Sequence, residues 1–592
     1  MDFNNKQLEA INHYEGACGV IAGAGSGKST VLINRIKTLV EKHRVPERDI
    51  LIISFTSATA KELKAKLNGF GLTQVKTGTF HAICRDILSK SGYLNGKTLI
   101  PEYKREQAIV SKETKLDTEA ILSFIGYQKN YLKSVTDEFE HFESEYTQDE
   151  LRRFYRGYES FKDKNHFYDH EDTLIEALRV LEKKKIHYTF PFLLVDEHQD
   201  SNLVQNELIK HLCPSRNIMC VQDYRQAIYG FRGSNPEFSM NFDKEYPGAK
   251  IINLDINYRS PANVVDKANH FIKRYYGDFK HYSDSIAHLK DRGIISKDVF
   301  YSSEEEGLSV AEKIESLIGS GEDINQIAVL FRNNSQVSNV EYELKLRNIS
   351  YYNAKGGSFF KRREIAAIIS YLRLISNPHD DVAFDSVFRF RNYPIQFFSN
   401  KLYNDIKSFS GVHNLSIFET LTSPEFKYDK PFQRKNAKEF CDMINNLRKQ
   451  YDKGISVTTM IDNLIKAFKF ETYIYNNSNN KEELEDKMKS LSLLKSFVKN
   501  NNLEQFINFT YSNKQNKHKE KDSVKLMTVH GSKGLEYKHV FLIGVEDGKF
   551  PSDKSDILEE ARLFYVAVTR PKENLYVSEI GRDNQFVKEY FN

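Results

Sequence analysis

The stretch that most limits how this chain can fold is a glycine-rich segment near its start, which follows the apolar run Gly19-Val20-Ile21 and precedes a helical pattern. Glycines let backbone N–H groups close around phosphate oxygens, and the helix N-terminus adds its positive dipole. The order therefore predicts a strand, a phosphate-binding loop and a helix, although Ala22 stands where the strict pattern has glycine. In such a loop Lys28 reaches the β and γ phosphates and the Ser29 hydroxyl ligates Mg²⁺. The predicted nucleotide-binding residues of this segment are Ala22, Gly23, Ala24, Gly25, Ser26, Gly27, Lys28, Ser29, Thr30 and Arg35.

Short apolar runs recur between helical stretches in two regions of the chain. Residues 19–21, 51–53 and 192–195 form the first group, and residues 327–330 and 540–543 form the second. These runs are continuous rather than alternating, which is typical of a parallel sheet covered on both faces. We therefore predict an α/β fold with two mostly parallel sheets, each flanked by helices.

At 592 residues the chain is too long for one hydrophobic core, so several domains are expected. Two long stretches, 87–167 and 378–519, are dominated by helix-like segments rich in charged and aromatic residues. We interpret them as mainly helical insertions. The predicted organisation is a first sheet domain at 1–86 and 168–255, and a second at 256–377 and 520–592.

Composition excludes few functions. Lys and Arg total 85 against 81 acidic residues, a net charge of +4 that neither demands nor excludes nucleic acid. None of the five cysteines forms a CxxC pair, so we expect neither a zinc or iron–sulfur site nor a disulfide framework. The start MDFNNKQLEA is polar, and no window approaches the roughly 20 apolar residues of a membrane span. We expect a cytoplasmic protein without a membrane partner.

Two adjacent carboxylates complete the predicted phosphate pocket. The apolar run 192–195 leads directly into Asp196 and Glu197, which places both at the carboxyl edge of the sheet, where ligands bind in open α/β folds. Asp196 can hold Mg²⁺, and Glu197 can orient and deprotonate an attacking water. Acidic residues at strand ends are often only caps, but together with the glycine-rich loop they indicate an ATP-hydrolysing enzyme.

Further motifs follow in order along the chain. They are Asn4-Asn5-Lys6-Gln7, Ser54-Phe55-Thr56, Gly78-Thr79-Phe80-His81, residues 221–233, Asn257-Tyr258-Arg259-Ser260, residues 327–334, residues 528–537 and residues 565–570. In this order they resemble the motifs of the UvrD/Rep/PcrA branch of superfamily 1 helicases and cover nearly the whole chain. The resemblance implies two RecA-like P-loop domains, ATP and Mg²⁺ as cofactors, movement on single-stranded DNA, and 3′-to-5′ unwinding of duplex DNA.

The resemblance also implies roles around the nucleotide. Gln7 would hydrogen-bond the adenine, Tyr258 would stack on it, and Glu536 would bind the ribose.

Gln226, Arg259 and Arg570 would act on the phosphates in this resemblance. Gln226 would sense the γ-phosphate, and Arg259 and Arg570, the latter as an arginine finger, would neutralise charge on the transferred phosphoryl group. Because both arginines lie beyond the loop domain, ATP hydrolysis would open and close a cleft between the two sheets.

A set of DNA contacts is implied as well. Phe55 and Phe231 can stack on bases, each interaction contributing roughly 1–3 kcal/mol regardless of sequence. For any one aromatic side chain taken alone, core packing is at least as common. The full implied set is Phe55, Thr56, Thr79, Phe80, His81, Tyr229, Phe231, Arg232, Arg332, Thr528 and His530.

Several positions depart from the family pattern. Arg225 stands where an acidic residue is usual, directly before Gln226. Residues 391–396, RNYPIQ, lack the Arg-Gly-Ile-Gly run, so we expect the second insertion to behave differently from that of the relatives. The other departures are Ser57, Ala58, Gln222 and Pro571.

These motifs bear on three candidate functions. The first is a translocase that acts on single-stranded and tailed duplex DNA, with a nuclease or a replication or repair factor as a protein partner. The second is a DNA-stimulated ATPase subunit or sensor, for example in phage defence, beside a separate nuclease; intact catalytic residues fit both. The third, a small-molecule kinase, leaves the motifs from Tyr258 to Arg570 unexplained.

Overall fold

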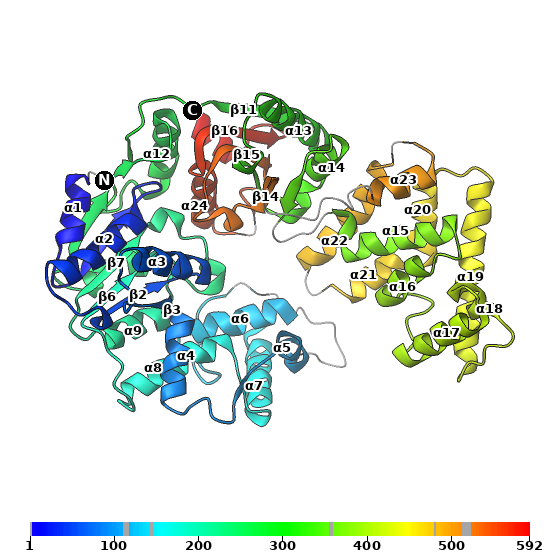
Figure 1. Ribbon diagram of the computed structural model, residues 1–592, viewed down its shortest axis with the longest axis horizontal. Coiled ribbons are helices and arrows are strands. Elements are labelled where there is room, and N and C mark those ends of the chain that lie inside the picture. The colour runs from blue at the N-terminus through cyan, green and yellow to red at the C-terminus, as the bar shows by residue number, and fades with distance from the viewer. Residues whose placement is uncertain are drawn as a thin grey trace. The chain divides into compact units, whose positions relative to one another are not determined.

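The structure is a computed structural model that describes residues 3–109, 118–142, 144, 146–353, 359–478, 481–498, 500–511, 522–553 and 555–592. Its chain forms two compact units (Figure 1). The first unit comprises Met1–Ser302, Gln326–Arg332 and Thr528–Asn592, and the second comprises Ser303–Asn325 and Asn333–Met527. The domain boundaries given above remain predictions, and the one at 519/520 lies outside the described residues.

A parallel sheet with the strand order β3-β2-β6-β7-β1-β8 forms the first part of the first unit. Its central strands are the apolar runs predicted from the sequence. The strands are β1 (Cys18–Ala22), β2 (Ile50–Ser54), β3 (Lys76–Thr79), β6 (Phe192–Val195), β7 (Ile218–Gln222) and β8 (Lys250–Leu254).

Helices cover both faces of this sheet, which explains why its strands are continuously apolar. Ile52 and Leu194 belong to one core cluster, whereas their chain neighbours Leu51 and Val195 belong to another on the opposite face. The first face carries α1 (Asn5–Asn12), α2 (Lys28–Glu41) and α3 (Ser57–Gly69). The second carries α4 (Phe80–Lys90), α8 (His170–Glu182), α9 (Leu203–Leu212) and α11 (Phe242–Glu245). The short helix α10 (Glu237–Met240) precedes α11.

The first predicted insertion contains helices with their own small core. Phe124, Tyr155 and Tyr158 are buried in it. Its elements are α5 (Glu102–Ile109), α6 (Thr118–Asn130), α7 (Gln148–Lys164), and the parallel pair β4 (Thr98–Leu99) and β5 (Phe167–Tyr168).

A second parallel sheet in the first unit has the strand order β11-β16-β15-β12. Phe271, Phe564 and Phe586 pack together from three helices that lie against one another, with Phe271 and Phe564 ring centroids 4.8 Å apart. The strands are β11 (Ile295–Phe300), β12 (Ile327–Phe331), β15 (Tyr537–Val545) and β16 (Pro571–Ile580), and the helices are α12 (Ala262–Tyr276), α24 (Ile557–Val568) and α25 (Gln585–Phe591). The strands of the short parallel pair β9 (Ile256–Asn257) and β10 (Ile286–Ala287) flank α12 along the chain. These two sheets with their helices confirm the predicted α/β class.

The second unit is mainly helical and has one aromatic-rich core, in which Tyr371, Phe384, Phe440 and Phe468 are buried. The divergent run 391–396 contributes to this core, because the buried Asn392 accepts a hydrogen bond from the Tyr371 hydroxyl. The helices are α13 (Ser303–Gly319), α14 (Ser338–Leu346), α15 (Arg363–Ser376), α16 (Asp381–Phe390), α17 (Asn400–His413), α18 (Ile417–Thr422), α19 (Pro431–Asp452), α20 (Val457–Ala467), α21 (Phe470–Asn476), α22 (Lys481–Ser496) and α23 (Leu503–Tyr511). A parallel strand pair, β13 (Tyr351–Asn353) and β14 (Val524–Thr528), accompanies them. Within the described part of the chain, no helix has the length and apolar character needed to cross a bilayer.

Candidate functional site

The glycine-rich loop joins the end of β1 to the first turn of α2. Gly25 and Gly27 have φ angles of +70° and +85°, which glycine adopts without strain. A Cβ atom on Gly25 would lie 2.6 Å from Cβ of Arg259 and 2.7 Å from Oδ1 of Asn257. The Tyr258 N–H also donates to the Gly25 carbonyl at 3.0 Å. The absent side chain of Gly25 therefore lets the segment 257–259 lie directly against the loop.

The two predicted carboxylates stand where β6 ends. Nζ of Lys28 lies 3.4 Å from Oε1 of Glu197, and the Gln199 amide donates to the other carboxylate oxygen of Glu197. Burial alone would raise the pKa of Glu197, but the ammonium groups of Lys28 and Lys533 outweigh it and lower this pKa to about 2. Glu197 is thus held as a carboxylate, the form that can accept a proton from water.

Asp196 is the less compensated member of the pair. Its residue is 4% exposed, and none of the described Lys or Arg side chains forms an ion pair with it. Burial and the neighbouring Glu197 raise the pKa of Asp196 to about 7. A divalent cation would stabilise the ionised form of this carboxyl, and Ser29 in the first turn of α2 offers a hydroxyl oxygen. These residues fit a Mg²⁺ site.

Two arginines from the second sheet region approach the loop and the carboxylates. Arg570 is only 1% exposed, and its Nη2 donates to Oε1 of Gln226 at 3.0 Å. Burial and the like charge of Arg259 lower the pKa of Arg570 to about 9. Nε of Arg259 donates to Oε2 of Glu536 at 2.6 Å. Both guanidinium groups are therefore fixed by hydrogen bonds before any ligand arrives.

A series of hydrogen bonds through Gln199, Asp223 and Gln226 connects Glu197 to Arg570. Gln199 donates to Glu197, and its Oε1 accepts from the Asp223 N–H at 2.9 Å. Nε2 of Gln226 then donates to Oδ2 of Asp223 at 2.6 Å, while its Oε1 faces Arg570. Because these side chains orient one another by hydrogen bonds, a change in the orientation of one can alter the orientation of the next.

Lys533 is a site residue to which sequence reasoning gave no role. Its Nζ lies 2.7 and 2.6 Å from the carboxylate oxygens of Asp200, and 2.6 Å from the backbone carbonyl oxygen of Gln226. It also lies 5.0 Å from the ring centroid of Tyr229. Lys533 lies in the motif 528–537 and Asp200 follows the carboxylate pair, but their pairing across 333 positions has no local sequence signal.

The residues expected around the base and ribose lie at the edge of this site. Nε2 of Gln7 donates to the Ser26 carbonyl at 3.1 Å, so the predicted adenine reader is tied to the loop. The Tyr258 hydroxyl accepts from Nδ2 of Asn4 at 3.0 Å. His288, which was not predicted, lies with its ring centroid 4.8 Å from that of Tyr258.

Arg35 lies apart from this group. It is two helical turns along α2 from Lys28, is 1% exposed, and donates to the Tyr14 carbonyl at 3.2 Å. Burial lowers its pKa to about 10. The structure therefore places Arg35 in the core of the first sheet domain rather than among the phosphate-binding groups.

Four predicted DNA contacts form a continuous row of rings. Phe55 stacks with Tyr229 at 5.7 Å between centroids, Tyr229 lies 6.2 Å from Phe231, and Phe231 lies 5.8 Å from His530. Phe231 is 53% exposed, which is unusual for so large an apolar side chain. The row combines side chains that follow β2, β7 and β14, and Lys533 lies against its second ring.

Other predicted DNA contacts have structural roles as well. Thr56 and Thr79 cap α3 and α4 by accepting from the backbone N–H groups of Thr59 and Ala82. Thr528 accepts from the Gly531 N–H at 3.2 Å.

Phe80 is buried and His81 is partly buried. Phe80 is 4% exposed and its ring packs in the core on one face of the sheet, and its assignment as a DNA contact stays a prediction. At the start of a helix, burying a ring that faces the sheet stabilises the fold more than leaving its apolar surface in water. His81 lies 5.8 Å from His170, and burial lowers its pKa to about 4.

The two arginines predicted to contact DNA are Arg332 and Arg232. Nη2 of Arg332 lies 3.0 Å from Oε1 of the buried Glu560, so its charge is already paired. The side chain of Arg232 lies outside the described part of the structure.

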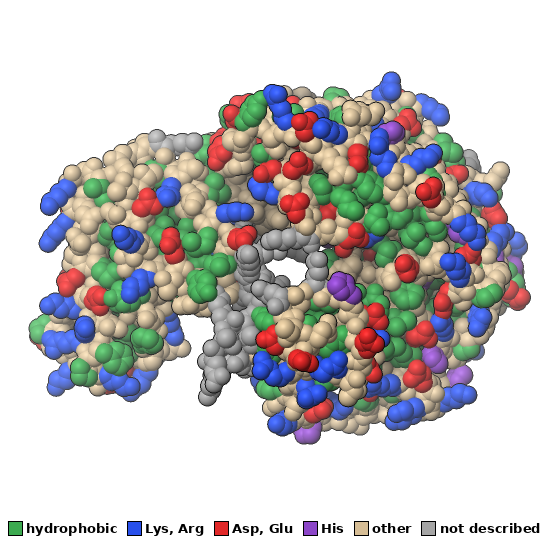
Figure 2. Space-filling view, turned by 180° about the vertical axis from the view of Figure 1, so that it is seen from behind, with side chains coloured by type: hydrophobic (Ala, Val, Ile, Leu, Met, Phe, Trp, Pro, Cys, Tyr) green, Lys and Arg blue, Asp and Glu red, His purple; other side chains and the backbone are tan. Residues whose placement is uncertain are grey.

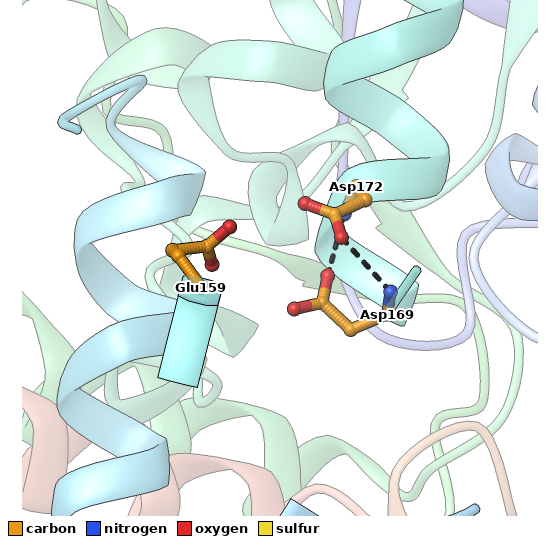
Figure 3. Close-up of side chains that lie close together, drawn as sticks. All are labelled: Glu159, Asp169 and Asp172. Atoms are coloured by element: carbon orange, nitrogen blue, oxygen red, sulfur yellow. Dashed lines mark hydrogen bonds between the residues drawn. The ribbon is translucent and has the colours of Figure 1, made fainter. Parts of the chain in front are cut away.

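A second carboxylate cluster, Glu159, Asp169 and Asp172, lies between α7 of the first insertion and the start of α8 (Figure 3). Its three side chains come from α7, the N-cap of α8 and the first turn of α8. The ammonium groups of Lys129 and Lys162 occupy this cluster, since Nζ of Lys129 lies 2.6 Å from both aspartates and 3.1 Å from Glu159. The carboxylates are therefore neutralised by lysines, and we interpret the cluster as structural rather than as a metal site.

Basic and acidic side chains are interspersed on the face drawn in Figure 2. This distribution agrees with the small net charge of +4. Attraction of a polyanion would therefore depend on local groups rather than on one large positive field.

Comparison with known proteins gives matches over nearly the whole chain. Residues 3–247 match the UvrD/REP helicase N-terminal domain, and residues 252–582 match the UvrD-like helicase C-terminal domain. The YjcD protein of Bacillus subtilis is 31% identical over 97% of this chain and 78% of its own length. The ATP-dependent DNA helicases PcrA of Staphylococcus epidermidis and Bacillus subtilis are each 29% identical, covering 98% and 97% of this chain and 83% and 82% of their own lengths. With the glycine-rich loop, the paired carboxylates and the two arginines assembled as described, the chain belongs to the UvrD-like helicase family.

Proposed function

We propose that this chain is an ATP-dependent DNA helicase that moves along single-stranded DNA and unwinds duplexes in the 3′-to-5′ direction. The observation that carries the proposal is the link between two groups of residues. The Lys533 ammonium touches Asp200 beside the carboxylate pair and also lies against Tyr229 in the row of rings. An enzyme that only phosphorylates small molecules would not require the row of rings.

ATP would bind with its phosphates on the glycine-rich loop. Lys28, at the start of α2, would exchange its 3.4 Å contact with Glu197 for contacts with the β and γ phosphates. Ser29 and Asp196 would hold Mg²⁺, which would supply positive charge against the phosphates. Freed from Lys28, Glu197 would orient a water molecule and accept its proton.

Arg259 and Arg570 would stabilise the charge that develops on the transferred phosphoryl group. To do so, Arg259 would exchange its contact with Glu536 for phosphate oxygen. Gln226 already holds Arg570 and would report the presence of the γ-phosphate to it. On this view Glu536 becomes available for the ribose when ATP binds, and Gln7 and Tyr258 hold the base.

The row of rings would bind the single strand by stacking, which is tolerant of sequence. Phe55 follows the first sheet, whereas His530 follows β14, so movement of the two elements would change the spacing of the row. Thr56, Thr79, His81, Arg332 and Thr528 would contribute polar contacts along the same path. Alternate gripping of bases during each ATP cycle would give a directional step.

Strand displacement on 3′-tailed, 5′-tailed and blunt duplexes, in DNA and in RNA, tests the proposal. We expect ATP-dependent unwinding of the 3′-tailed DNA substrate and none by Glu197→Gln, which keeps the nucleotide pocket but lacks the base. Arg448→Gln, a change on the exposed surface of α19, is the matched control and should unwind normally. ATP hydrolysis without displacement of any substrate would favour the alternative of an ATPase subunit or sensor that needs a partner.

A further inference from the structure

Arg225 is a buried positive charge at a position where the family motif usually has an acidic residue. It is 3% exposed, and it follows β7, the strand that leads to Asp223. Its Nε donates to Oδ1 of Asp223 at 2.8 Å, and its Nη1 donates to the Ser283 carbonyl at 3.3 Å. A buried arginine is costly unless such partners hold it, so its position is closely specified.

Packing fixes the guanidinium group from several sides. Its central carbon lies 5.7 Å from the ring centroids of both Tyr224 and Tyr565. On another side lies the glycine-rich loop, because a Cβ atom on Gly23 would stand 3.0 Å from Nη2 of Arg225. The group therefore rests between the loop, β7 and α24, with little room to move.

The other oxygen of Asp223 orients the side chain of Gln226. Oδ2 of Asp223 accepts from Nε2 of Gln226 at 2.6 Å, which leaves Oε1 to accept from Nη2 of Arg570 at 3.0 Å. A carboxylate oxygen accepts hydrogen bonds, so the contact with Asp223 selects this orientation of the amide.

We propose that Arg225 is a positioning residue for hydrolysis, which fixes Asp223 and thereby orients Gln226 and the guanidinium of Arg570. Without Arg225, Oδ1 of Asp223 would lose the hydrogen bond that fixes this side chain, and the Gln226 amide held by Oδ2 would lose its fixed orientation. Nη2 of Arg570 would then lose its Gln226 acceptor, one of several that hold the guanidinium, and the group would be placed less precisely. This inference rests on the proposed ATP-hydrolysing function.

ATPase kinetics of the full chain with single-stranded DNA test this role. We expect Arg225→Met to lower kcat on the order of 10- to 100-fold, somewhat less than the loss of a direct oxyanion donor. KM for ATP should change less than about 3-fold, since Arg225 is not among the predicted nucleotide-binding residues. Arg225→Lys keeps the charge near Asp223 and should recover part of kcat.

A double-mutant cycle separates positioning from general destabilisation. If Arg225 acts through Gln226, the Arg225→Met/Gln226→Ala variant should be no slower than Gln226→Ala alone. Tyr565→Phe removes a hydroxyl beside Arg225 but keeps the ring contact, and it should hydrolyse ATP at nearly the wild-type rate. Thermal unfolding and fluorescent nucleotide binding identify variants that have failed to fold. If Arg225→Met is one of them, the kcat of Arg225→Lys is compared with that of the wild type instead.

Two results overturn the inference. One is a normal kcat for both Arg225→Met and Arg225→Lys, and the other is a loss in the double mutant equal to the product of the two single losses. An active wild-type chain with an equally active Arg225→Met overturns this inference alone, whereas a wild-type chain without ATPase activity overturns the proposed function as well.

Discussion

Replacing Lys533 with methionine would remove the ammonium that lies 2.7 and 2.6 Å from the Asp200 carboxylate oxygens. The two side chains are 8% and 1% exposed, so water cannot replace the lost contacts. Removing one partner of a buried ion pair costs roughly 3–5 kcal/mol, because the other charge is left uncompensated. We expect the free energy of unfolding of the first unit to fall by about this amount at pH 8.

The loss should depend on pH, because Asp200 can become neutral. Burial raises the pKa of Asp200 to about 6 even with Lys533 beside it. For an acid whose folded pKa lies above its unfolded value, stability is lost as pH rises between the two values. Without Lys533 the folded pKa rises further, so the variant should be closer to wild type at pH 6 than at pH 8, by up to about 1.4 kcal/mol per pH unit.

Thermal unfolding at pH 6 and pH 8 measures the effect. A loss of this size corresponds to a Tm decrease on the order of 10 °C for a large domain. The Lys533→Met/Asp200→Asn variant removes both charges of this ion pair and should regain most of that Tm, while losing DNA stimulation of the ATPase. Equal Tm values for Lys533→Met and wild type at pH 8, or no recovery in the double variant, would refute the reasoning.

Three further predictions concern other parts of the molecule. Arg570→Ala should bind ATP normally but hydrolyse it at least 100-fold more slowly, since it removes a charge that acts on the transferred phosphoryl group; equal losses of nucleotide binding and turnover, measured by fluorescent nucleotide titration and ATPase assay, would contradict this. Phe231→Ala should weaken single-stranded DNA binding by roughly 1–3 kcal/mol in a salt-dependent anisotropy titration, whereas Phe80→Ala should lower Tm with little change in DNA affinity among folded molecules. Glu341 is 2% exposed, and burial raises its pKa to about 7. Glu341→Gln should therefore stabilise the second unit at pH 8 by up to about 3 kcal/mol and by much less at pH 5, as measured by thermal unfolding. Stabilisation that does not vary with pH would contradict this origin.

The nucleotide pocket was accessible from the sequence because its parts obey local rules. The apolar runs of β1 and β6 predict parallel strands, and parallel strands end at one edge, so Lys28, Asp196 and Glu197 had to meet. The prediction of two parallel sheets flanked by helices is confirmed for the same reason. No such rule fixes a pair like Lys533 and Asp200, which depends on how two distant segments pack.

The order of the motifs also does not show which of their side chains are buried. Phe80 and Phe231 both stand in DNA-contact motifs, yet one is 4% and the other 53% exposed. Arg35 follows the loop at helical spacing but turns into the core, where its guanidinium meets the Tyr14 carbonyl. Arg225 was recognisable as a departure from the family, but its role needed the position of Asp223, Gln226 and Arg570.

The most direct test of the central claim is the ATPase rate of the purified chain with and without single-stranded DNA, alongside Glu197→Gln. If the carboxylate pair and the row of rings belong to one motor, wild-type hydrolysis should rise several-fold with DNA and weaken as salt reduces binding, while Glu197→Gln stays inactive in both conditions. A wild-type ATPase that is indifferent to single-stranded DNA would contradict the coupling between Asp200, Lys533 and Tyr229 on which the account depends.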